Sequence, residues 1–457
     1  MYRISSSFRD PSGRVYEDNG KIFRTIADEY KPHFEALIAS GLYDALVGEG
    51  LIVPHVETGK TSNEYWKLIS PQKIDFISYP FEWSFTQLKD AALLTLRIMK
   101  LSLERGMCLK DASAFNVQLH HGKPIFIDTL SFEKRERGVP WMAYGQFCRH
   151  FLAPLLLMVY TDTRMQNMFI HYLDGIPLDL ASKLLPMRSW FKPGIILHMH
   201  THAKMVVKSA GNAVNATQQA ENRKTSVDTT PALIDSLTHL IQSIKSPVQK
   251  TEWGDYYSDT NYSAKAFASK KEIVDRYVAA INPKTACDLG ANDGTFSRIA
   301  GKYANIVISA DIDPVAVEKN YRQLRQEEVG NIIPVLIDLT NPTPGLGWAN
   351  SEWMRFGDRC RADVVLALGL LHHLCISNNL PLDFVADYLA ELSDYAIVEF
   401  IPKSDSNVQR LLASRRDIFP QYTQAGFETA FHKCFEILDS DRIADSQRRL
   451  YYMKKRT

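Results

Sequence analysis

Two acidic residues and two glycines in the second half of the chain have the types and spacing of a ligand-binding turn. Asp288 ends one apolar run, and Gly290 and Gly294 follow it four positions apart; a second apolar run, residues 306–310, ends in Asp311. A strand, a glycine turn and a helix N-terminus together allow close approach of backbone N–H groups to a ligand. The spacing of the two acids fits one β-α-β step, which predicts that the second carboxylate binds a ribose.

This segment lacks the G-x-G-x-x-G spacing of dinucleotide-binding turns. An acid at the end of a strand followed by G-x-x-x-G instead resembles the first motif of class I S-adenosylmethionine-dependent methyltransferases. In that family the turn wraps the methionine part of the cofactor, and the acid that ends the second strand binds the ribose hydroxyls. The alternative is an ordinary glycine turn of an α/β domain. The cofactor-binding residues that the resemblance implies are Asp288, Gly290, Asn292, Gly294, Asp311, Ile312, Asp338, Leu339 and Leu368.

Two further strands are expected to end at the same place. Residues 332–337 form an apolar run before Asp338, and residues 362–368 precede a Leu-Leu-His-His-Leu segment that contains His372 and His373. In class I methyltransferases an acid at the first position often contacts the adenine amino group, and the second strand ends where the methyl group is delivered. A histidine there is a candidate catalytic base. The alternative is that His372 or His373 caps a helix or bonds to backbone.

The chain has no N-P-P-Y-type motif after residue 368, which favours oxygen, carboxylate or another nucleophile over a base or amide nitrogen as the methyl acceptor. A fifth strand is expected at residues 395–401, and residues 435–438 and 450–453 are expected to form a closing hairpin. Five parallel strands and an antiparallel hairpin make the seven-stranded Rossmann-like sheet of a methyltransferase, an α/β fold. Ligands of such sheets gather at the carboxyl ends of the parallel strands.

The first half of the chain contains a second chemical pattern. Asp111 and Asn116 are separated as D-x-x-x-x-N, a short hairpin follows, and the return strand ends in Asp128. This order resembles the catalytic and metal-binding loops of protein-kinase-like folds. The resemblance implies Asp111 as the catalytic base, Asn116 and Asp128 as magnesium ligands, and Mg-ATP as a ligand. The alternative is that Asp111 and Asn116 only cap and turn a loop.

Several positions depart from the kinase pattern. Lys110 stands where His-Arg is usual, and Asp128 is followed by Thr-Leu in place of Phe-Gly. The strand expected at residues 21–26 places Arg24 on its apolar face, where a kinase carries lysine, and an arginine fork is not equivalent to a point charge. Three hypotheses therefore stay open. The first is a methyltransferase that acts on a small molecule, a glycan or a protein side chain and whose N-terminal half recruits this acceptor. The second is a bifunctional kinase and methyltransferase, and the third is a non-catalytic kinase-like interaction module.

The expected organisation is a kinase-like α+β domain over residues 1–205, a linker over residues 206–231 and a methyltransferase domain over residues 232–457. The linker is rich in Asn, Ala, Gln, Thr and Ser and cannot bury a core. Aromatic residues at 253–262 are expected to form a lid or to pack a helix over residues 264–281. Both halves together resemble a NoeA-like bacterial family of methyltransferases.

The amino-acid composition limits the possible partners and the cellular compartment of the protein. The chain has 53 Lys and Arg against 52 Asp and Glu, so bulk charge gives no nucleic-acid signature. Its six cysteines include no C-x-x-C pair, which argues against a zinc site and fits a reducing compartment. The longest apolar run, residues 151–160, is too short to cross a bilayer. We expect a cytoplasmic protein with an unidentified methyl acceptor as its partner, no membrane partner and an undetermined oligomeric state.

Three alternating histidines form a last candidate group. His198, His200 and His202 would share one face of a strand and could bind a metal there, although no acid or cysteine lies next to them. A polar strand or a helix end is the alternative.

Overall fold

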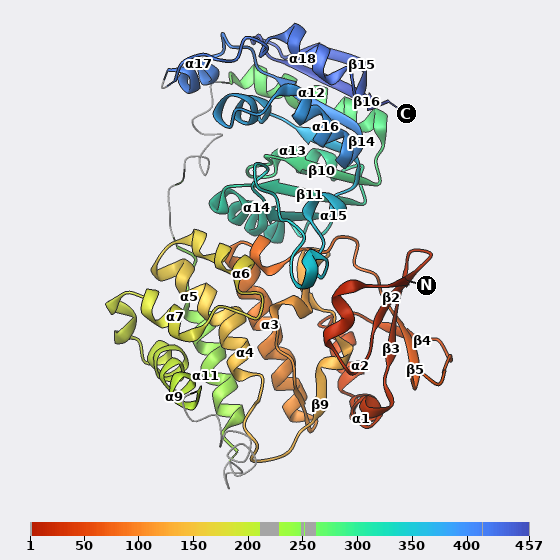
Figure 1. Ribbon diagram of the computed structural model, residues 1–457, viewed down its shortest axis with the longest axis vertical. Helices are drawn as coiled ribbons and strands as arrows, with labels where there is room; N and C mark the ends of the chain where they lie inside the picture. Colours follow the sequence, from red (N-terminus) through yellow and green to blue (C-terminus); the bar gives the residue numbers. More distant parts are fainter. Residues whose placement is uncertain (1, 211–227, 248–250, 252–261, 414, 457) are drawn as a thin grey trace. The chain divides into compact units, whose positions relative to one another are not determined.

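The computed structural model describes residues 2–210, 228–247, 251, 262–413 and 415–456 of the 457-residue chain. Most of the expected linker and most of the expected aromatic lid lie outside the described residues. The chain forms two compact units (Figure 1). The first contains residues 1–248 and 346–353, and the second contains residues 249–345 and 354–457.

The second unit is built on a seven-stranded sheet, which confirms the predicted strand number. Its order is β12 (Ile332–Leu336), β11 (Ile306–Asp311), β10 (Thr285–Leu289), β13 (Ala362–Ala367), β14 (Ser393–Phe400), β16 (Arg449–Lys455) and β15 (Phe435–Arg442). The first five strands run parallel, and β16 is antiparallel to both of its neighbours. The parallel strands are buried along almost their whole length, as their continuous apolar sequences require.

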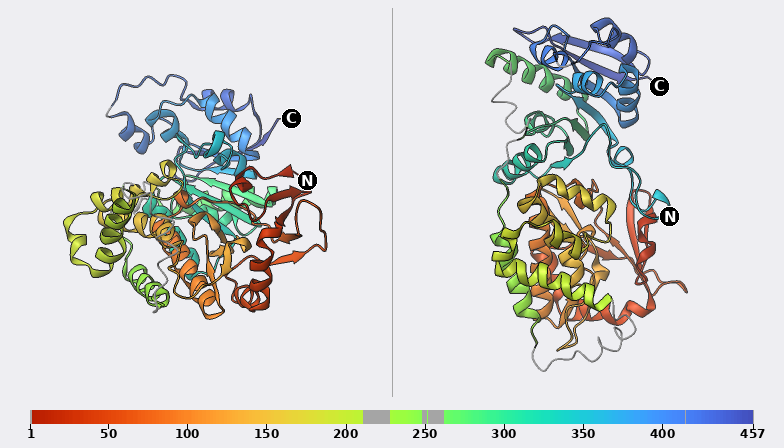
Figure 2. Two further views of the ribbon diagram at one scale, coloured as in Figure 1. Left: turned by 60° about the horizontal axis from the view of Figure 1, so that its bottom comes forward. Right: turned by 60° about the vertical axis from the view of Figure 1, so that its left-hand side comes forward.

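Helices connect these strands. They are α12 (Ala264–Ile281), α13 (Thr295–Ala300), α14 (Pro314–Gln326), α15 (Phe356–Arg359), α16 (Leu382–Leu392), α17 (Ser406–Leu412) and α18 (Gln424–Phe431). Helix α12 has the predicted bounds and packs its apolar face, including Val274 and Val278, into a core with β10, β13 and β14. Figure 2 shows both units from two further sides.

The first unit begins with a five-stranded antiparallel sheet in the order β1 (Tyr2–Arg3), β2 (Val15–Asp18), β3 (Lys21–Ile26), β5 (Lys67–Pro71) and β4 (His55–Glu57). A 3-10 turn, Ser5–Arg9, separates β1 from β2. Helices α1 (Lys31–Ala39) and α2 (Leu42–Gly48) are separate, because Gly41 takes a left-handed φ of 68° between them.

Helix α3 (Phe85–Glu104) leads to two hairpins, β6 (Met107–Leu109) with β9 (Phe132–Lys134) and β7 (Val117–His120) with β8 (Lys123–Phe126). The rest of the unit is helical. Its α-helices are α4 (Tyr144–Phe147), α5 (Ala153–Tyr160), α6 (Met168–His171), α7 (Leu178–Leu184), α8 (Pro193–Ile195), α9 (His202–Ala210) and α11 (Thr230–Ser243). No helix among the described residues is long and apolar enough to cross a membrane.

The interpretation of the three alternating histidines as one strand face is wrong. His198 and His200 lie in a π-helical turn, Ile196–Thr201, and His202 begins α9. The ring nitrogens of His198 lie 2.9 Å from the Tyr144 hydroxyl and 2.8 Å from the Ser236 hydroxyl. Both ring nitrogens of His200 also lie within 2.9 Å of serine hydroxyls. These rings are therefore buried hydrogen-bonding groups of a helical core.

The expected start of the second domain at residue 232 differs from the observed division. Helix α11 belongs to the first unit, where it packs beside α3. Lys89 Nζ on α3 donates to the carbonyl oxygens of Gln242 at 3.0 Å and Ile244 at 2.6 Å, and Lys100 pairs with Asp235 at 2.9 Å. The amphipathic sequence of α11 indicated a helix, but not which core its apolar face would join.

The segment Leu346–Trp353 lies between β12 and β13 in sequence, yet it is part of the first unit. Glu352 is buried there and forms a two-bonded ion pair with Arg9, in which Nη2 lies 3.0 Å from Oε2. The Trp353 ring lies 5.1 Å from the Phe115 ring and packs against a cluster built on Tyr79, Phe81 and Phe169. This segment therefore completes an aromatic core that the first 248 residues leave open.

We predict that Trp353→Ala destabilises the first unit by about 3 kcal/mol, because it removes a large ring from this aromatic core. Hydrogen exchange measured by mass spectrometry should show lost protection around residues 79–81 and 169. The matched control is Trp348→Ala in the same segment, since Trp348 is 74% exposed and should change protection little. Equal protection in both variants would contradict the assignment of this segment.

Candidate functional site

The turn after β10 contains three residues with left-handed backbone at alternate positions. Gly290, Asn292 and Gly294 have φ values of 71°, 51° and 78°. A side chain at 294 has no room, because a Cβ there would lie 2.4 Å from Oδ1 of Asn320. Asn292 takes a conformation that asparagine tolerates better than most residues. The turn therefore has three left-handed positions, of which two are glycines and the third is Asn292.

Asp288 lies behind this turn as a buried carboxylate. Its Oδ2 accepts a hydrogen bond from Ser297 Oγ at 2.6 Å, and Ser297 is bonded in turn to Ser309 at 2.8 Å. Burial raises its pKa to about 7, opposed by the Ser297 hydrogen bond and by the positive charge of Lys270. In this arrangement Asp288 joins β10 to α13 and β11, and so supports the turn.

Asp311 connects the turn to the next strand. Its Oδ2 accepts from the Asn292 N–H and its Oδ1 accepts from the Asp313 N–H, both at 2.8 Å. Burial raises its pKa to about 6. The next residue, Ile312, is apolar but 54% exposed, as expected of a surface that a flat ring can cover.

The strand register brings the predicted cofactor residues to one sheet edge. Leu289 is aligned with Ala310 on one side and Ala367 on the other, and Asp311 is aligned with Leu336. Since the strands are parallel, the residues that follow each of them lie along the same carboxyl edge. These residues are Gly290, Asn292, Gly294, Ile312, Asp338, Leu339 and Leu368.

Two of these positions have further contacts. Asp338 is half-buried, and its Oδ1 accepts from the Thr340 N–H at 2.8 Å and hydroxyl at 2.7 Å. The loop after β13 covers the glycine turn, because a Cβ on Gly290 would lie 3.3 Å from Leu370 Cδ1. The cofactor roles of all these residues remain predictions.

The two candidate catalytic histidines lie next to each other after β13. His372 is fully buried, and within the described part of the chain neither of its ring nitrogens has a hydrogen-bond partner. Its pKa lies well below the ordinary value because of burial and the positive charges of His373, Arg448 and Lys270. Burial lowers the pKa of His373 to about 4. Both rings are therefore neutral at pH 7.

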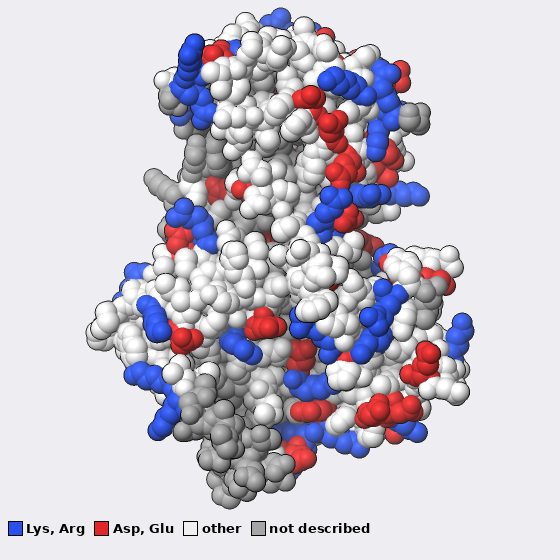
Figure 3. Space-filling model, viewed as in Figure 1, with Lys and Arg blue, Asp and Glu red and all other residues white. Residues whose placement is uncertain are grey.

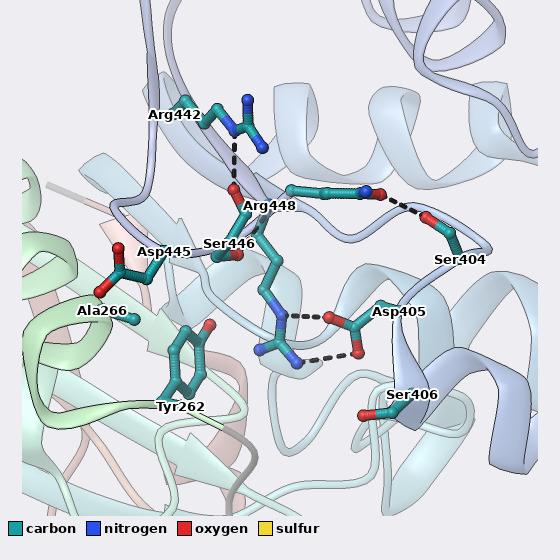
Figure 4. Close-up of a pocket in the computed structure, with 10 residues that line it drawn as sticks. Tyr262, Ala266, Ser404, Asp405, Ser406, Arg442, Asp445, Ser446 and Arg448 are labelled. Atoms are coloured by element: carbon teal, nitrogen blue, oxygen red, sulfur yellow. Dashed lines mark hydrogen bonds and ion pairs between the residues drawn. The ribbon is translucent and has the colours of Figure 1, made fainter.

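A buried ionic cluster built on Glu399 lies at the end of β14. Lys270 Nζ on α12 lies 2.8 Å from Glu399 Oε2, and both side chains are almost completely buried. The Tyr262 hydroxyl donates to Glu399 Oε1. Arg448 donates to both carboxylate oxygens of Asp405, at 2.8 and 3.0 Å (Figure 4).

Burial raises the pKa of Glu399, but the positive charges of Lys270 and Arg448 outweigh burial and keep that pKa below the ordinary value. Glu399 is therefore ionised at pH 7, and the cluster is held together by charge. Lys270 and Arg448 could not be found from the sequence, because a lysine in a helix and an arginine in a turn normally point to solvent.

The first unit brings together the three residues that the kinase-like pattern selected. Asp111 Oδ1 accepts from the Gln146 amide at 2.8 Å, and the Asn116 side chain also bonds to Asp111. Ser131 links the other two, 3.2 Å from Asn116 Nδ2 and 2.7 Å from Asp128 Oδ2. Burial and the negative charge of Asp128 raise the pKa of Asp111.

Arg24 pairs with Asp128, the carboxylate that the kinase-like pattern assigns to a metal ion. Its Nη2 lies 2.9 Å from Asp128 Oδ1 and 2.5 Å from Asp10 Oδ2. The other Asp128 oxygen is bonded to Ser131. Among the described residues, no group of three His, Cys, Asp or Glu side chains could hold a metal ion. The guanidinium supplies the positive charge that these carboxylates need.

We predict that Asp288→Asn becomes increasingly stabilising, relative to the wild type, as pH rises. The pKa of Asp288 is about 7 in the folded chain against an ordinary 3.8, so the unfolded state ionises first. The stability that this group contributes is complete below about pH 4 and is lost as pH approaches 7, at most about 4 kcal/mol. Urea unfolding at several pH values measures the difference.

The control for this prediction is Asp394→Asn, the same substitution at an exposed position on the same sheet, which removes no buried carboxyl group. A pH-independent difference between Asp288→Asn and the wild type would contradict the prediction.

We predict that Arg24→Met lowers the free energy of unfolding of the first unit by about 3 kcal/mol, because two partly buried carboxylates lose their cation. If Arg24 takes a metal's place, millimolar magnesium chloride should restore part of this stability in the variant and none in the wild type. Arg97→Met is the control, since its pair with Glu49 is exposed and is worth below about 1 kcal/mol. Equal losses of unfolding free energy in Arg24→Met and Arg97→Met would contradict the role of Arg24 as the cation of these carboxylates.

Comparisons with known proteins show which proteins this chain resembles. No protein-family model matches it. Similar solved structures include the N-methyltransferase NodS from Bradyrhizobium japonicum WM9, 10% identical over 43% of this chain and 99% of that one, with a TM-score of 0.32. Magnesium protoporphyrin IX methyltransferase (ChlM) from Synechocystis PCC 6803 is 19% identical over 44% of this chain and 90% of that one, with a TM-score of 0.31. Scores this low carry no functional argument.

A full-length relative is much closer in sequence. The nodulation protein NoeA of Rhizobium meliloti (strain 1021) is 33% identical over 460 residues, which cover 99% of this chain and 96% of that protein. Because this identity extends over both units, the chain belongs to the family of the nodulation protein NoeA.

Proposed function

We propose that the second unit is an S-adenosylmethionine-dependent methyltransferase. The observation that carries the proposal is the position of the left-handed turn at Gly290 and of Asp311 on one carboxyl edge of a seven-stranded sheet. The sheet has the five parallel strands and antiparallel hairpin expected of class I methyltransferases. Kinship with NoeA extends the proposal to a role in nodulation.

The residues at this edge fit the cofactor. The backbone of the 290–294 turn would follow its methionine part, and the Asp311 carboxylate would accept hydrogen bonds from the ribose. Adenine would lie on the exposed Ile312 side chain, beside Asp338 and Leu339. Leu368, at the end of β13, would line the site near the methyl group. Bound S-adenosylmethionine supplies a methyl group on a positively charged sulfur, which is the chemical driving force.

The chain itself would position the acceptor and exclude water. His372 has two ring nitrogens without partners among the described residues and stays neutral. It can therefore accept a hydrogen bond from an acceptor hydroxyl and orient the oxygen. Since nearby positive charges oppose protonation of this ring, the proton released on methylation would pass on to water. We propose His372 as a positioning residue; the ring centre of His373 lies 4.0 Å from its own, with the two ring planes tilted by 42°.

We further propose that the first unit recruits the acceptor and does not transfer phosphate. The assembly of Asp111, Asn116 and Asp128 favours a common origin with kinase-like folds. However, Arg24 already neutralises Asp128, so a magnesium ion there would meet a guanidinium. Binding of Mg-ATP that Asp128→Ala abolishes would instead support the bifunctional alternative.

Calorimetry with S-adenosylhomocysteine tests the main proposal. Wild-type protein should bind it, and Gly290→Arg should lose at least about 100-fold in affinity, because the side chain would meet Leu370 and strain a left-handed backbone. Asp311→Asn should lose about tenfold through weaker ribose binding.

The matched control is Gly20→Arg, the same substitution at a left-handed glycine with no neighbour within 4 Å of an added Cβ. It lies in the first unit and should leave the affinity unchanged. If the wild type fails to bind S-adenosylhomocysteine, the methyltransferase proposal is wrong.

A further inference from the structure

A polar pocket of about 340 Å³ lies beside the ionic cluster of the second unit (Figure 4). It is formed by the start of α12, the segment after β14 and the turn between β15 and β16. Its lining consists of three serines, one glutamine, two aspartates, two arginines, one tyrosine and one alanine. A concavity of this size is large enough to hold a small ligand.

The charges of the lining are already matched within the protein. At the floor, Arg448 and Asp405 are bonded to each other through two hydrogen bonds, and the Arg448 guanidinium lies 4.2 Å from the Tyr262 ring centre. At the rim, Arg442 Nε donates to the Ser446 carbonyl at 2.7 Å, and Asp445 pairs with Lys265 at 3.3 Å. With two carboxylates and two guanidiniums, the lining has no surplus charge to neutralise an ionic ligand.

An apolar ligand fits the pocket equally poorly. Ala266 is the one aliphatic side chain in the lining, so an apolar group would gain little while covering hydroxyl, amide and charged groups. Two of the remaining neutral groups are already partly bonded: Ser404 Oγ donates to Gln447 Oε1 at 2.5 Å, and the Ser446 hydroxyl accepts from the Arg448 N–H at 2.9 Å. The Ser404 oxygen can still accept a hydrogen bond, and the Gln447 amide N–H groups can still donate one. A ligand that carries several hydroxyl groups and no charge satisfies them best.

Buried side chains connect the pocket to the glycine turn. Tyr262 lines the pocket and donates to Glu399, which pairs with Lys270 at 2.8 Å. Lys270 Nζ in turn lies 4.6 Å from the ring centre of Phe296, in the first turn of α13 directly after Gly294. The pocket thus shares one packed set of side chains with the proposed methyl-transfer site.

We propose that this pocket binds the methyl acceptor and that the acceptor presents an uncharged, polyhydroxylated ring such as a sugar unit; this inference rests on the proposed methyltransferase function. In the reaction, a hydroxyl oxygen of the ring forms a bond to the methyl carbon as the carbon–sulfur bond breaks. The sulfur keeps the electron pair, and the hydroxyl proton passes to water.

Saturation-transfer NMR on the full-length chain, with and without S-adenosylhomocysteine, tests the proposal. The probes are glucose, glucuronate and glucosamine, which share a ring but differ in charge, and 1-octanol as an apolar probe. Glucose should give the strongest signal. Gln447→Trp, which fills the exposed rim of the pocket, should reduce that signal at least about tenfold.

The matched control is Glu436→Trp, an exposed position on β15 outside the pocket lining, which should keep the glucose signal. The pocket proposal is overturned if glucose gives no signal, if Gln447→Trp retains it, or if a charged or apolar probe gives a stronger one. Calorimetry with S-adenosylhomocysteine separates this proposal from the methyltransferase proposal. A glucose signal that Gln447→Trp abolishes supports the pocket as a polyol site. Failure of the wild-type protein to bind S-adenosylhomocysteine overturns the role of the pocket as the acceptor site.

Discussion

The ion pair between Lys270 and Glu399 is the interaction on which the second unit's carboxyl edge depends. Two charges removed from water cost several kcal/mol each, and they are tolerated only with close partners and further hydrogen bonds. Here Tyr262 and Arg448 supply those partners. The same pair links α12, which precedes the sheet in sequence, to β14, the fifth parallel strand. Any loss of this pairing would therefore loosen the floor of the proposed acceptor pocket and the wall beside the glycine turn together.

Two further carboxylates hold the edge in different ways. Asp288 and Asp311 are buried and form no ion pair with another described residue, so hydrogen bonds from Ser297 and from backbone N–H groups stabilise them, and burial raises their pKa values. A buried carboxylate lowers the free energy of unfolding relative to an apolar side chain packed at the same position. Strain and buried polarity concentrate where a ligand must be bound, which is the pattern expected of a functional edge. The first unit shows the opposite solution, because Arg24 neutralises the carboxylates that a phosphotransferase would leave for magnesium.

Local patterns in the sequence determined a large part of this protein. Three apolar runs end in Asp288, Asp311 and Asp338, and a glycine turn follows the first of them. Such patterns can be recognised from neighbouring residues along the chain and from the general rules of parallel sheets. They predicted the seven-stranded sheet and the edge that gathers these residues. The D-x-x-x-x-N spacing likewise brought Asp111 and Asn116 together, since they are five positions apart and the chain between them enters a single 3-10 turn, Ala114–Asn116.

Only the tertiary structure decided which distant residues meet. Lys270 is the buried partner of Glu399, more than a hundred positions away, and Arg448 is the buried partner of Asp405, about forty positions away. No local pattern in the sequence marks such pairs. The segment containing Glu352 and Trp353 joined the first unit, because its aromatic and charged side chains complete a core there and not beside its neighbours in sequence. The histidines at 198, 200 and 202 alternate like a strand, yet they lie in helices, because tertiary packing overrides a short period-two pattern. Long-range packing and charge compensation are properties of the folded chain, and short stretches of sequence do not encode them.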